Sequence, residues 1–499
     1  MTAIIRRNKG ALLRLLLITV LVWIVWLPLV TSGNYRMDSD RIIHTPEIAL
    51  DQYVREGRSA LVLLLRVFGL TEWNPVLSGI LYLVFFSAAC WILYFRLRAE
   101  TGWKNGYPEL FLLLYALSPV WAYHGYFVLQ VAAVGFGMLL TAITACVDVR
   151  MLSAKKDKGI RILWEAAALA MLAFSLLIYQ TLAVNYLITL TVLLFCRNLR
   201  ERKDDLRILV RLAVRMVLAL AVYCAVTKLL RGNASAGTLT AQVLWKKDSV
   251  VRCLFRIAEE IGATMLMYKS RYFSLYTLGA VLLVILWFRR RKTEWKGNAM
   301  PVLMGLGMLL LPFCLSVVLG NVTVPRSQFA LQMTAAFLPV CFMAETEGKH
   351  RVLRAVCVAA VIIQAVLFAR LYYTDEVRNR QDTAAAETIA AELAETDPGK
   401  PVMFIGVLKM NEGSLLTEKS DVFGRTFFEW VYTPDKPASA TQPALRLLTA
   451  VTGKEYQAAD LSKKHVKQIV KKTADMPCYP EKGFVREEED CVVVRLSVR

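Results

Sequence analysis

Long apolar runs alternate with short charged connections along most of the 499-residue chain. Most of these runs reach the roughly 20 residues that an α-helix needs to cross a bilayer. Hydrophobic residues make up 56% of the sequence, more than is usual in a soluble protein. The pattern predicts a polytopic α-helical membrane protein with about eleven transmembrane helices, at residues 11–31, 76–95, 107–125, 127–148, 162–179, 181–196, 208–229, 273–288, 299–319, 328–345 and 352–371.

Lys and Arg gather in every second connection between these runs, for example in FRLRAETGWK and CRNLRERKDDLRILVR. Because cytoplasmic loops of membrane proteins collect these residues, the N-terminus is predicted inside and the chain after residue 371 outside. The net charge of +20 is thereby explained by topology, and nucleic acid is not an expected partner. Residues 230–272 depart from the pattern, since this loop is basic although it falls on the outer side.

Two domains follow from this topology. Residues 1–371 are predicted to form the transmembrane domain, with residues 32–75 as its first outer loop. Within that loop, residues 59–70 are too short to span and are interrupted by Arg66, so we expect an amphipathic helix at the outer surface. Residues 372–499 are predicted to form a small α/β extracytoplasmic domain, with helices at 375–394, 443–451 and 460–473, a buried strand at 401–408 and a terminal hairpin at 483–496.

Cysteine and histidine patterns give little sign of soluble-enzyme chemistry. The ten cysteines form no CxxC pair, and the sequence has no P-loop, no HExxH and no GxSxG. Cys478 and Cys491 lie in the predicted outer domain, where thiols can oxidise, and they bracket the terminal hairpin. The sequence therefore predicts a disulfide between them.

Acidic and basic side chains are concentrated in the first outer loop. Asp38 and Asp40 are two residues apart, so in an extended chain they point the same way. One carboxylate can then act as a general base while the other positions it or a divalent cation; no other cofactor is indicated. Arg41 and Arg58 are suited to binding an anionic phosphate. The alternative interpretation is a solvated acidic loop with local ion pairs.

The predicted outer ends of other spans carry further polar groups. The third span ends in SPVWAYHGYF, with Tyr123 and His124, and the fifth and sixth meet at LLIYQTLAVNY, with Tyr179 and Gln180. Aromatic residues at this depth are also typical of an interfacial belt. A buried glutamine amide needs partners, which makes Gln180 harder to assign to the belt.

Three cations complete the set of candidate substrate-binding residues. Arg326 follows Pro325 at the start of the tenth span, and Lys269 and Arg271 belong to the basic outer loop. Positive charge on the outer side is suited to holding a lipid phosphate near membrane depth. The alternative is an amphipathic helix resting on anionic lipid headgroups.

With these segments in place, the sequence resembles the GtrII-type bacterial glucosyltransferases, membrane enzymes of the GT-C class. The resemblance rests on NYRMDSDR and YVREGR in the first outer loop, on SPVWAYHGYF and SLLIYQTLAVNYL, and on VPRSQF late in the membrane region. These motifs are short, and their order and spacing carry the resemblance across most of the chain.

The resemblance implies transfer of a sugar, typically glucose, from a polyprenyl-phosphate donor to a cell-surface glycan, outside the bacterial cytoplasmic membrane. It also implies an acidic catalytic residue in the first outer loop, which Asp38 and Asp40 match, with Arg58 and Arg326 as ligands of the donor phosphate. The family tends to have adjacent acids, whereas Ser39 separates them here, so which aspartate is the base is left open, as is metal dependence.

Two other function classes were weighed. An ion-coupled transporter would need ionisable groups at mid-membrane depth, whereas Glu109, Asp148, Glu165, Arg354 and Arg370 lie at the ends of the predicted spans. A lipid flippase with a basic cavity stays an alternative, and it would need no pair of acids. A non-catalytic scaffold for envelope assembly gives no reason for acids and arginines to share one loop. Enzymatic sugar transfer therefore remains the favoured hypothesis.

Overall fold

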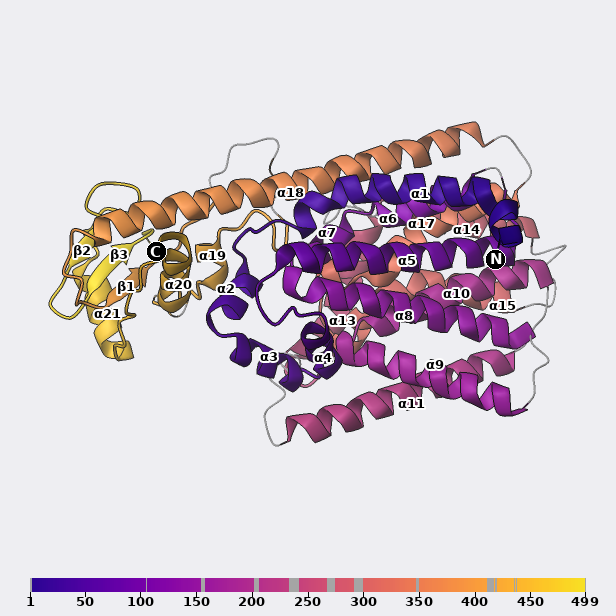
Figure 1. Cartoon of the computed structure of the whole chain (residues 1–499), viewed down its shortest axis with the longest axis horizontal. Helices are drawn as coiled ribbons and strands as arrows, with labels where there is room; N and C mark the ends of the chain where they lie inside the picture. Colours follow the sequence, from indigo (N-terminus) through magenta and orange to yellow (C-terminus); the bar gives the residue numbers. More distant parts are fainter. Residues whose placement is uncertain are drawn as a thin grey trace. The chain divides into compact units, whose positions relative to one another are not determined.

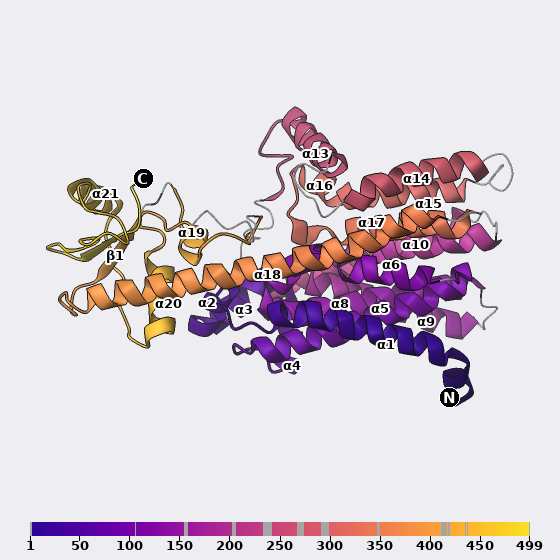
Figure 2. The ribbon, with the colours of Figure 1, turned by 90° about the horizontal axis from the view of Figure 1, so that it is seen from above.

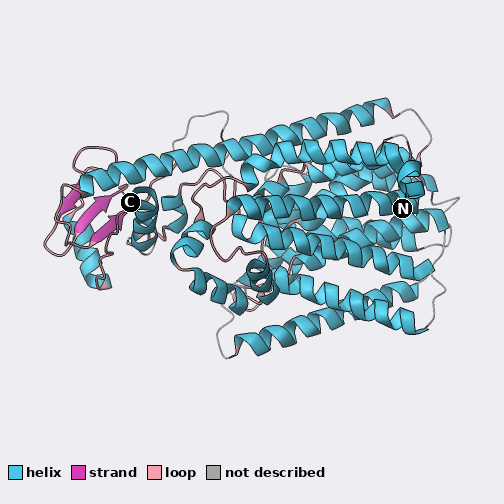
Figure 3. Ribbon diagram, viewed as in Figure 1, coloured by secondary structure: helices cyan, strands magenta, loops and turns pink. Residues whose placement is uncertain are grey.

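The structure is a computed structural model of the whole chain, and it describes residues 2–104, 106–153, 158–201, 206–232, 242–266, 274–290, 299–346, 350–410, 417, 420–434, 436 and 438–498. It divides into two compact units. Met1–Thr31 and Leu50–Phe368 form the first, here called the helical unit, and Ser32–Ala49 and Ala369–Arg499 form the second, the α/β unit. Within the described residues, strands are confined to the α/β unit (Figure 3).

The helical unit is a bundle of long helices joined by shorter ones (Figure 1). In chain order its elements are α1 (Thr2–Val30), α3 (Pro46–Arg55, which begins in the other unit), α4 (Ser59–Val67), α5 (Pro75–Thr101), α6 (Tyr107–Ala116), α7 (Val120–Gly125), α8 (Val128–Ser153), α9 (Lys158–Ile178), α10 (Leu182–Glu201), α11 (Leu206–Arg231), α13 (Val250–Met265), α14 (Ser274–Arg290), α15 (Met300–Leu310), η2 (Leu311–Phe313), α16 (Cys314–Leu319), η3 (Pro325–Ser327), α17 (Phe329–Glu345) and the first half of α18 (Arg351–Leu393).

The core of this bundle is formed by α8, α10 and α17. Helix α10 packs against α5, α8, α9, α15 and α17, and α17 is buried along its length from Phe329 to Met343. Peripheral helices instead expose large apolar side chains, such as Leu17 on α1 and Val217 on α11. A helix that is apolar on its exposed face is suited to lipid contact, because the hydrocarbon core offers no water to hydrate polar groups.

Eight helices in the described residues are long and apolar enough to cross a membrane. This confirms the multi-pass membrane class, while the predicted number of eleven and the inside–outside orientation stay predictions. Each of the eleven predicted segments contains a helix. Residues 299–319 are divided into α15, η2 and α16, and residues 107–125 are divided into α6 and α7. The break lies at Ser118–Pro119, because a proline disfavours helical backbone in the residue before it.

The α/β unit is built around a small sheet in the order β1–β3–β2. Strand β1 (Val402–Ile405) pairs in parallel with β3 (Val492–Arg495), and β2 (Val485–Glu487) pairs antiparallel with β3. The hairpin of β2 and β3 and the buried strand β1 confirm the predicted strands. The helices of this unit are α2 (Met37–His44), α19 (Phe427–Val431), α20 (Thr441–Thr452), α21 (Lys463–Lys472) and the second half of α18.

Each face of this sheet has its own apolar core, because successive side chains of a strand point to opposite faces. Val402, Phe404, Val492 and Val494 belong to the core that contains residues of α18 and α20. Met403, Ile405 and Val493 belong to the other core, with Ile469 of α21. The sheet is therefore buried on both sides within its own unit.

Helix α18 is far longer than a membrane is thick. Its 43 residues extend about 65 Å, whereas the hydrocarbon core is about 30 Å thick. The apolar sequence ends near Leu371, and charged residues follow from Asp375 onward. Only the first half of α18 is thus suited to the bilayer, and the predicted boundary at residue 371 falls inside a continuous helix.

Candidate functional site

A sharp turn between α3 and α4 directs the side chain of Arg58. Gly57 in this turn has a φ of +77°, a conformation that favours glycine. A Cβ at Gly57 would also lie 2.4 Å from the Tyr223 hydroxyl oxygen, so any larger residue would displace the Tyr223 side chain or the turn. The amide of Arg58 closes the turn by donating to the carbonyl of Tyr53 at 2.8 Å. The sequence YVREGR thus fixes where the guanidinium lies.

Uncharged groups make the close contacts of the Arg58 side chain. Its Nη1 donates to Gln130 Oε1 at 3.0 Å, and its guanidinium carbon lies 5.0 Å from the centre of the Tyr179 ring. Glu56 Oε2 is 3.7 Å from Nη2, a longer ion pair. The buried Nε has no hydrogen-bond partner in the described part of the chain. A buried donor without a partner is costly, and it indicates a position where a ligand can bind.

Gln180, which lies between α9 and α10, connects this turn to α11. Its Nε2 donates to the backbone oxygen of Glu56 and to the hydroxyl of Tyr223, both at 2.9 Å. The expectation that this amide needs partners is confirmed. We call the following residues the Arg58 cluster: Tyr53, Glu56, Arg58, Gln130, Tyr179, Gln180 and Tyr223.

The Arg58 cluster contains residues that sequence reasoning missed. Glu56 is only 9% exposed, and its Oε1 accepts a hydrogen bond from Gln52 at 3.0 Å. Tyr53 accepts from Gln130 Nε2 at 3.1 Å. An available signal for Glu56 was an acid placed directly before a glycine and an arginine where a helix ends.

An aromatic group adjoins the cluster and leads towards Arg326. The ring of Tyr179 lies 6.3 Å from those of His124 and Phe329, and the last two are 4.7 Å apart. The guanidinium of Arg326, in η3, lies 5.0 Å from the ring of Phe127, and η3 packs against α7. His124 is buried and its Nε2 has no partner within the described residues. Tyr123, by contrast, is fully buried among core residues.

The loop that carries Arg326 is held by a buried carboxylate on α13. Glu260 is 6% exposed and accepts from the Thr323 amide at 3.0 Å and from Gln328 Nε2 at 2.8 Å. The hydroxyls of Ser316 and Thr323 also donate to it. Figure 2 shows α13 beside α16, at the end of the bundle away from the N-terminus of α1. The basic segment 230–272 thus contributes an acid that positions η3, while its Lys269 and Arg271 lie outside the described residues.

Asp38 and Asp40 lie in the α/β unit, on α2, and not in an extended loop. The amide of Arg36 donates to Ser39 Oγ at 3.1 Å, which begins the helix. Residues two apart on a helix are separated by about 200°, so the two carboxylates point to different sides. The expectation that they point the same way is therefore wrong.

The two aspartates also differ in their surroundings. Asp40 is buried, accepts from the Tyr35 hydroxyl at 2.8 Å and pairs with Arg446 Nη1 at 3.2 Å. Burial, followed by the charge of Asp40, raises the pKa of Tyr35. Asp38 and Arg41 are each half-buried on the same helix. Asp40 is thus bound by its own unit on both carboxylate oxygens, and Asp38 is the more accessible of the two acids.

A buried ion-pair network connects the start of the α2 segment to α18 within the α/β unit. Asp375 accepts from Arg36 Nη2 and from Arg378 Nη2, both at 2.6 Å, and Arg378 Nη1 donates to Asp382 at 3.1 Å. All four side chains are at most 2% exposed. We call Arg36, Asp375, Arg378 and Asp382 the ion-pair network.

The predicted disulfide is not present, because Cys478 and Cys491 are both free thiols. Tyr479 donates to the carbonyl of Arg495 at one end of β3, whereas Cys491 precedes the strand at the other end. Four strand residues extend about 13 Å, and disulfide-bonded Cα atoms are usually about 4.4–6.8 Å apart. The hairpin thus holds its two cysteines apart. The option of a divalent cation at Asp38 and Asp40 stays a prediction.

Comparison with known protein families gives one match. A sequence model described as glucosyl transferase GtrII matches residues 27–343, more than half of the chain. The matched region includes α2, the Arg58 cluster and η3, and it ends before α18. No curated protein and no solved structure matches the chain. The family implies glucosyl transfer. Together with the eight candidate spans, it indicates a membrane glycosyltransferase. The chain belongs to the GtrII glucosyl transferase family.

Proposed function

We propose that the protein transfers glucose from a polyprenyl-phosphate donor to a cell-surface glycan on the outer face of the bacterial cytoplasmic membrane. Family membership supports the transferred sugar, and the eight candidate spans support a lipid-linked donor that stays in the bilayer. The alternation of basic connections supports chemistry on the outer side.

One observation carries the assignment of a phosphate-linked donor. Arg58 lies over the ring of Tyr179 and Arg326 over the ring of Phe127 in the helical unit, and two buried nitrogen atoms, Arg58 Nε and His124 Nε2, have no partner among the described residues. A phosphate offers several acceptor oxygens, and arginine binds such oxygens with two parallel hydrogen bonds. The neighbouring rings are suited to the apolar start of the lipid chain. Arg58 and Arg326 are therefore proposed as ligands of the donor phosphate.

The reaction itself needs a base and a stabilised leaving group. The oxygen of an acceptor hydroxyl attacks the anomeric carbon, and its proton passes to a carboxylate. The bond from the anomeric carbon to the phosphate oxygen breaks, and polyprenyl phosphate leaves with the electron pair. Arginines directed at that oxygen stabilise its developing charge. Asp38 is proposed as the base, because the family resemblance implies an acid in this segment and Asp38 is half-buried whereas Asp40 is buried.

A transfer assay with purified variants tests this proposal. Full-length protein is incubated with radiolabelled polyprenyl-phosphate glucose and a crude cell-wall acceptor. Wild type is expected to move label to the acceptor, and Asp38→Asn to reduce turnover about 10²–10⁴-fold while donor binding is kept. Asp40→Asn is the matched control, with a smaller loss caused by the broken pair with Arg446. No transfer by folded wild type, or wild-type turnover in Asp38→Asn, would contradict the donor or the base respectively.

The orientation is tested separately. A reporter that is active only outside the cytoplasm, fused after Arg380, is expected to be active. Activity of a cytoplasm-specific reporter at the same position would reverse the proposed orientation, and with it the outer-face chemistry.

A further inference from the structure

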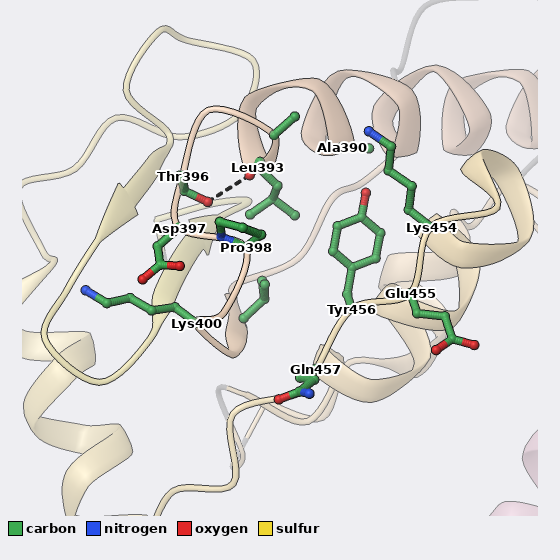
Figure 4. A pocket seen from close by; sticks show the side chains of 12 residues that line it. Ala390, Leu393, Thr396, Asp397, Pro398, Lys400, Lys454, Glu455, Tyr456 and Gln457 are labelled. Carbon is green, nitrogen blue, oxygen red and sulfur yellow. Dashed lines mark hydrogen bonds between the residues drawn. The ribbon is translucent and has the colours of Figure 1, made fainter.

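A cavity of about 250 Å³ lies within the α/β unit, in a region that the GtrII match does not reach. Figure 4 shows it between the end of α18, the turn that follows it, and the segment Lys454–Gln457. This segment extends the sheet beyond β1, because the Val402 amide donates to the Gln457 carbonyl at 2.7 Å and the Ala459 amide to the Val402 carbonyl at 3.0 Å. The walls of the cavity are thus tied to the sheet.

The lining combines an apolar base with a polar rim. Leu393 and Val402 are buried at its base, and the half-buried ring of Tyr456 lines one side. Asp397 and Gln457, both exposed, belong to the rim. A sugar ring has apolar C–H faces and hydroxyl edges, so it matches a pocket with an aromatic wall and a few convergent polar groups.

The charges around the cavity favour a neutral ligand. Two lysines, Lys400 and Lys454, are accompanied by two acids, Asp397 and Glu455. Lys400 Nζ is bound within the unit, since it lies 2.7 Å from Glu487 Oε1 and donates to the Glu488 carbonyl at 3.0 Å. No excess of positive charge is left at the rim to bind a phosphate, and a glycan of uncharged sugars fits better.

The lining contains a buried polar atom that lacks a partner within the described residues. The hydroxyl of Tyr456 is buried and has no hydrogen-bond partner within the described residues. Thr396, on the opposite wall, already donates to the Leu393 carbonyl at 2.8 Å (Figure 4). Asp397 Oδ1 accepts from the Gly399 amide at 2.9 Å, which fixes the turn and the direction of this carboxylate. A buried hydroxyl without a partner calls for an explanation, and a bound sugar hydroxyl would supply one.

We propose that this cavity binds a neutral hexose unit of the acceptor glycan, with the Tyr456 hydroxyl, Asp397 and Gln457 as its hydrogen-bonding groups. The site would hold a growing or finished glycan by a sugar other than the one that reacts. Its description as an acceptor subsite rests on the proposed function, whereas its affinity for sugars does not.

The test uses full-length protein in a zwitterionic detergent, because a maltoside headgroup would compete for a sugar site. Saturation-transfer NMR and titration with methyl glycosides of glucose, galactose and rhamnose measure binding, with inorganic phosphate as the anionic comparison. At least one glycoside is expected to bind saturably, and phosphate is not expected to compete with it. Tyr456→Phe keeps the ring and is expected to weaken binding about 2- to 10-fold, the value of one hydrogen bond.

Two further variants keep the result interpretable. Asp397→Asn retains an oxygen for the Gly399 amide and is expected to weaken binding by a similar factor. Tyr479→Phe is the matched control, since this ring packs against the same core through Phe484 but does not line the cavity. Absence of saturable binding, or equal affinity of wild type, Tyr456→Phe and Asp397→Asn, would overturn the proposal.

The transfer assay on the same samples separates the two proposals. If glycosides bind and Tyr456→Phe weakens that binding, but no transfer is seen, the result supports the sugar site and contradicts the proposed function. Transfer without glycoside binding would overturn the sugar site alone. If both hold, Tyr456→Phe is expected to raise KM for the acceptor and leave KM for the donor unchanged.

Discussion

Arg36 and Arg378 of the α/β unit are buried and Arg58 of the helical unit is half-buried, and the partners of these arginines differ. In the ion-pair network of the α/β unit, Arg36 and Arg378 share the carboxylate of Asp375, and Arg378 also binds Asp382. In the Arg58 cluster of the helical unit, the close partners of Arg58 are an amide and an aromatic ring, and its Nε has no partner among the described residues.

This difference separates a structural use of arginine from a ligand-binding one. Buried charges that are fully paired contribute no binding capacity, but removing one member leaves the others uncompensated. An arginine held mainly by uncharged groups keeps more of its charge for an incoming anion. Variants of the ion-pair network should therefore change stability, and variants of the Arg58 cluster should change substrate binding.

The largest expected effect is that of Asp375→Asn. This change keeps the shape of the side chain but leaves Arg36 and Arg378 without their shared carboxylate. We expect the free energy of unfolding of the α/β unit to fall by about 3–5 kcal/mol. Hydrogen exchange of the amides in β1 and β3 measures it. Glu376→Gln is the control, because the ion pair of Glu376 within the described residues is with the exposed Arg380, and the change should cost at most about 1 kcal/mol.

A pH dependence follows from the same network. Burial raises the pKa of Asp382 to about 6, although Arg378 and the Phe427 amide favour its charged form. Burial alone would raise the pKa of Asp375 as well, but the charges of Arg36 and Arg378 outweigh it and hold that pKa well below its ordinary range. The two carboxylates therefore affect stability in opposite directions.

Titration of Asp382 makes the folded α/β unit less stable as the pH rises. Between about pH 4 and 6 the folded state keeps a proton that the unfolded chain releases, so the unfolding free energy falls as pH rises and is level above 6. The loss is at most about 3 kcal/mol. For Asp375 the stabilisation is present above about pH 4 and lost below it. The unfolding free energy of Asp382→Asn, relative to that of wild type, is expected to be greater at pH 7 than at pH 4. A constant difference between the two proteins would show that Asp382 does not titrate in this range.

In the helical unit, Arg58→Gln is expected to raise KM for the donor about 10- to 100-fold, the range for hydrogen bonds to a charged group. Its kcat should change less, and the thermal stability of the unit should stay near that of wild type. Arg58→Lys keeps the charge but not the paired geometry, so it should recover only part of the loss. Arg252→Gln, on the exposed side of α13, is the control. If KM for the donor is unchanged in Arg58→Gln, then Arg58 has a structural role and does not bind the donor.

The same comparison explains what could be predicted from the sequence. The spans followed from apolar runs. His124, Gln180 and Arg326 were found because each lies at an end of a span, and Arg58 because it lies in the charged loop between the first two spans. Ends that share one side of a bundle meet in space, so local pattern was sufficient there. The strands β1 and β3 were likewise marked by short runs of buried residues.

Other features depend on residues far apart in the chain and gave no local signal. Asp40 is bound by Arg446, 406 positions later, and Arg36 by Asp375, 339 positions later. The N-cap of α2 is Arg36, and arginine is not among the usual N-cap residues. The segment was therefore predicted to be extended. Glu260 was missed because its partners belong to another loop.

The smallest of these effects is expected at Glu260, which acts on the donor only through the loop of Arg326. Glu260→Gln keeps one acceptor oxygen but brings an amide NH₂ towards the donors of Thr323 and Gln328, so the loop loses part of its support. We expect KM for the donor to rise about 3- to 10-fold, the value of one or two hydrogen bonds, with little change in kcat. Glu259→Gln, one residue away and half-exposed, is the control.

A double-mutant cycle distinguishes this positioning role from a general loss of stability. If Glu260 acts through Arg326, then Glu260→Gln should have little further effect on KM once Arg326→Ala is present, because the contact that it supports is already gone. If the rise in KM of the double variant equals the product of the rises of the two single variants, the two residues act independently. The carboxylate would then serve only to hold α13 against α16.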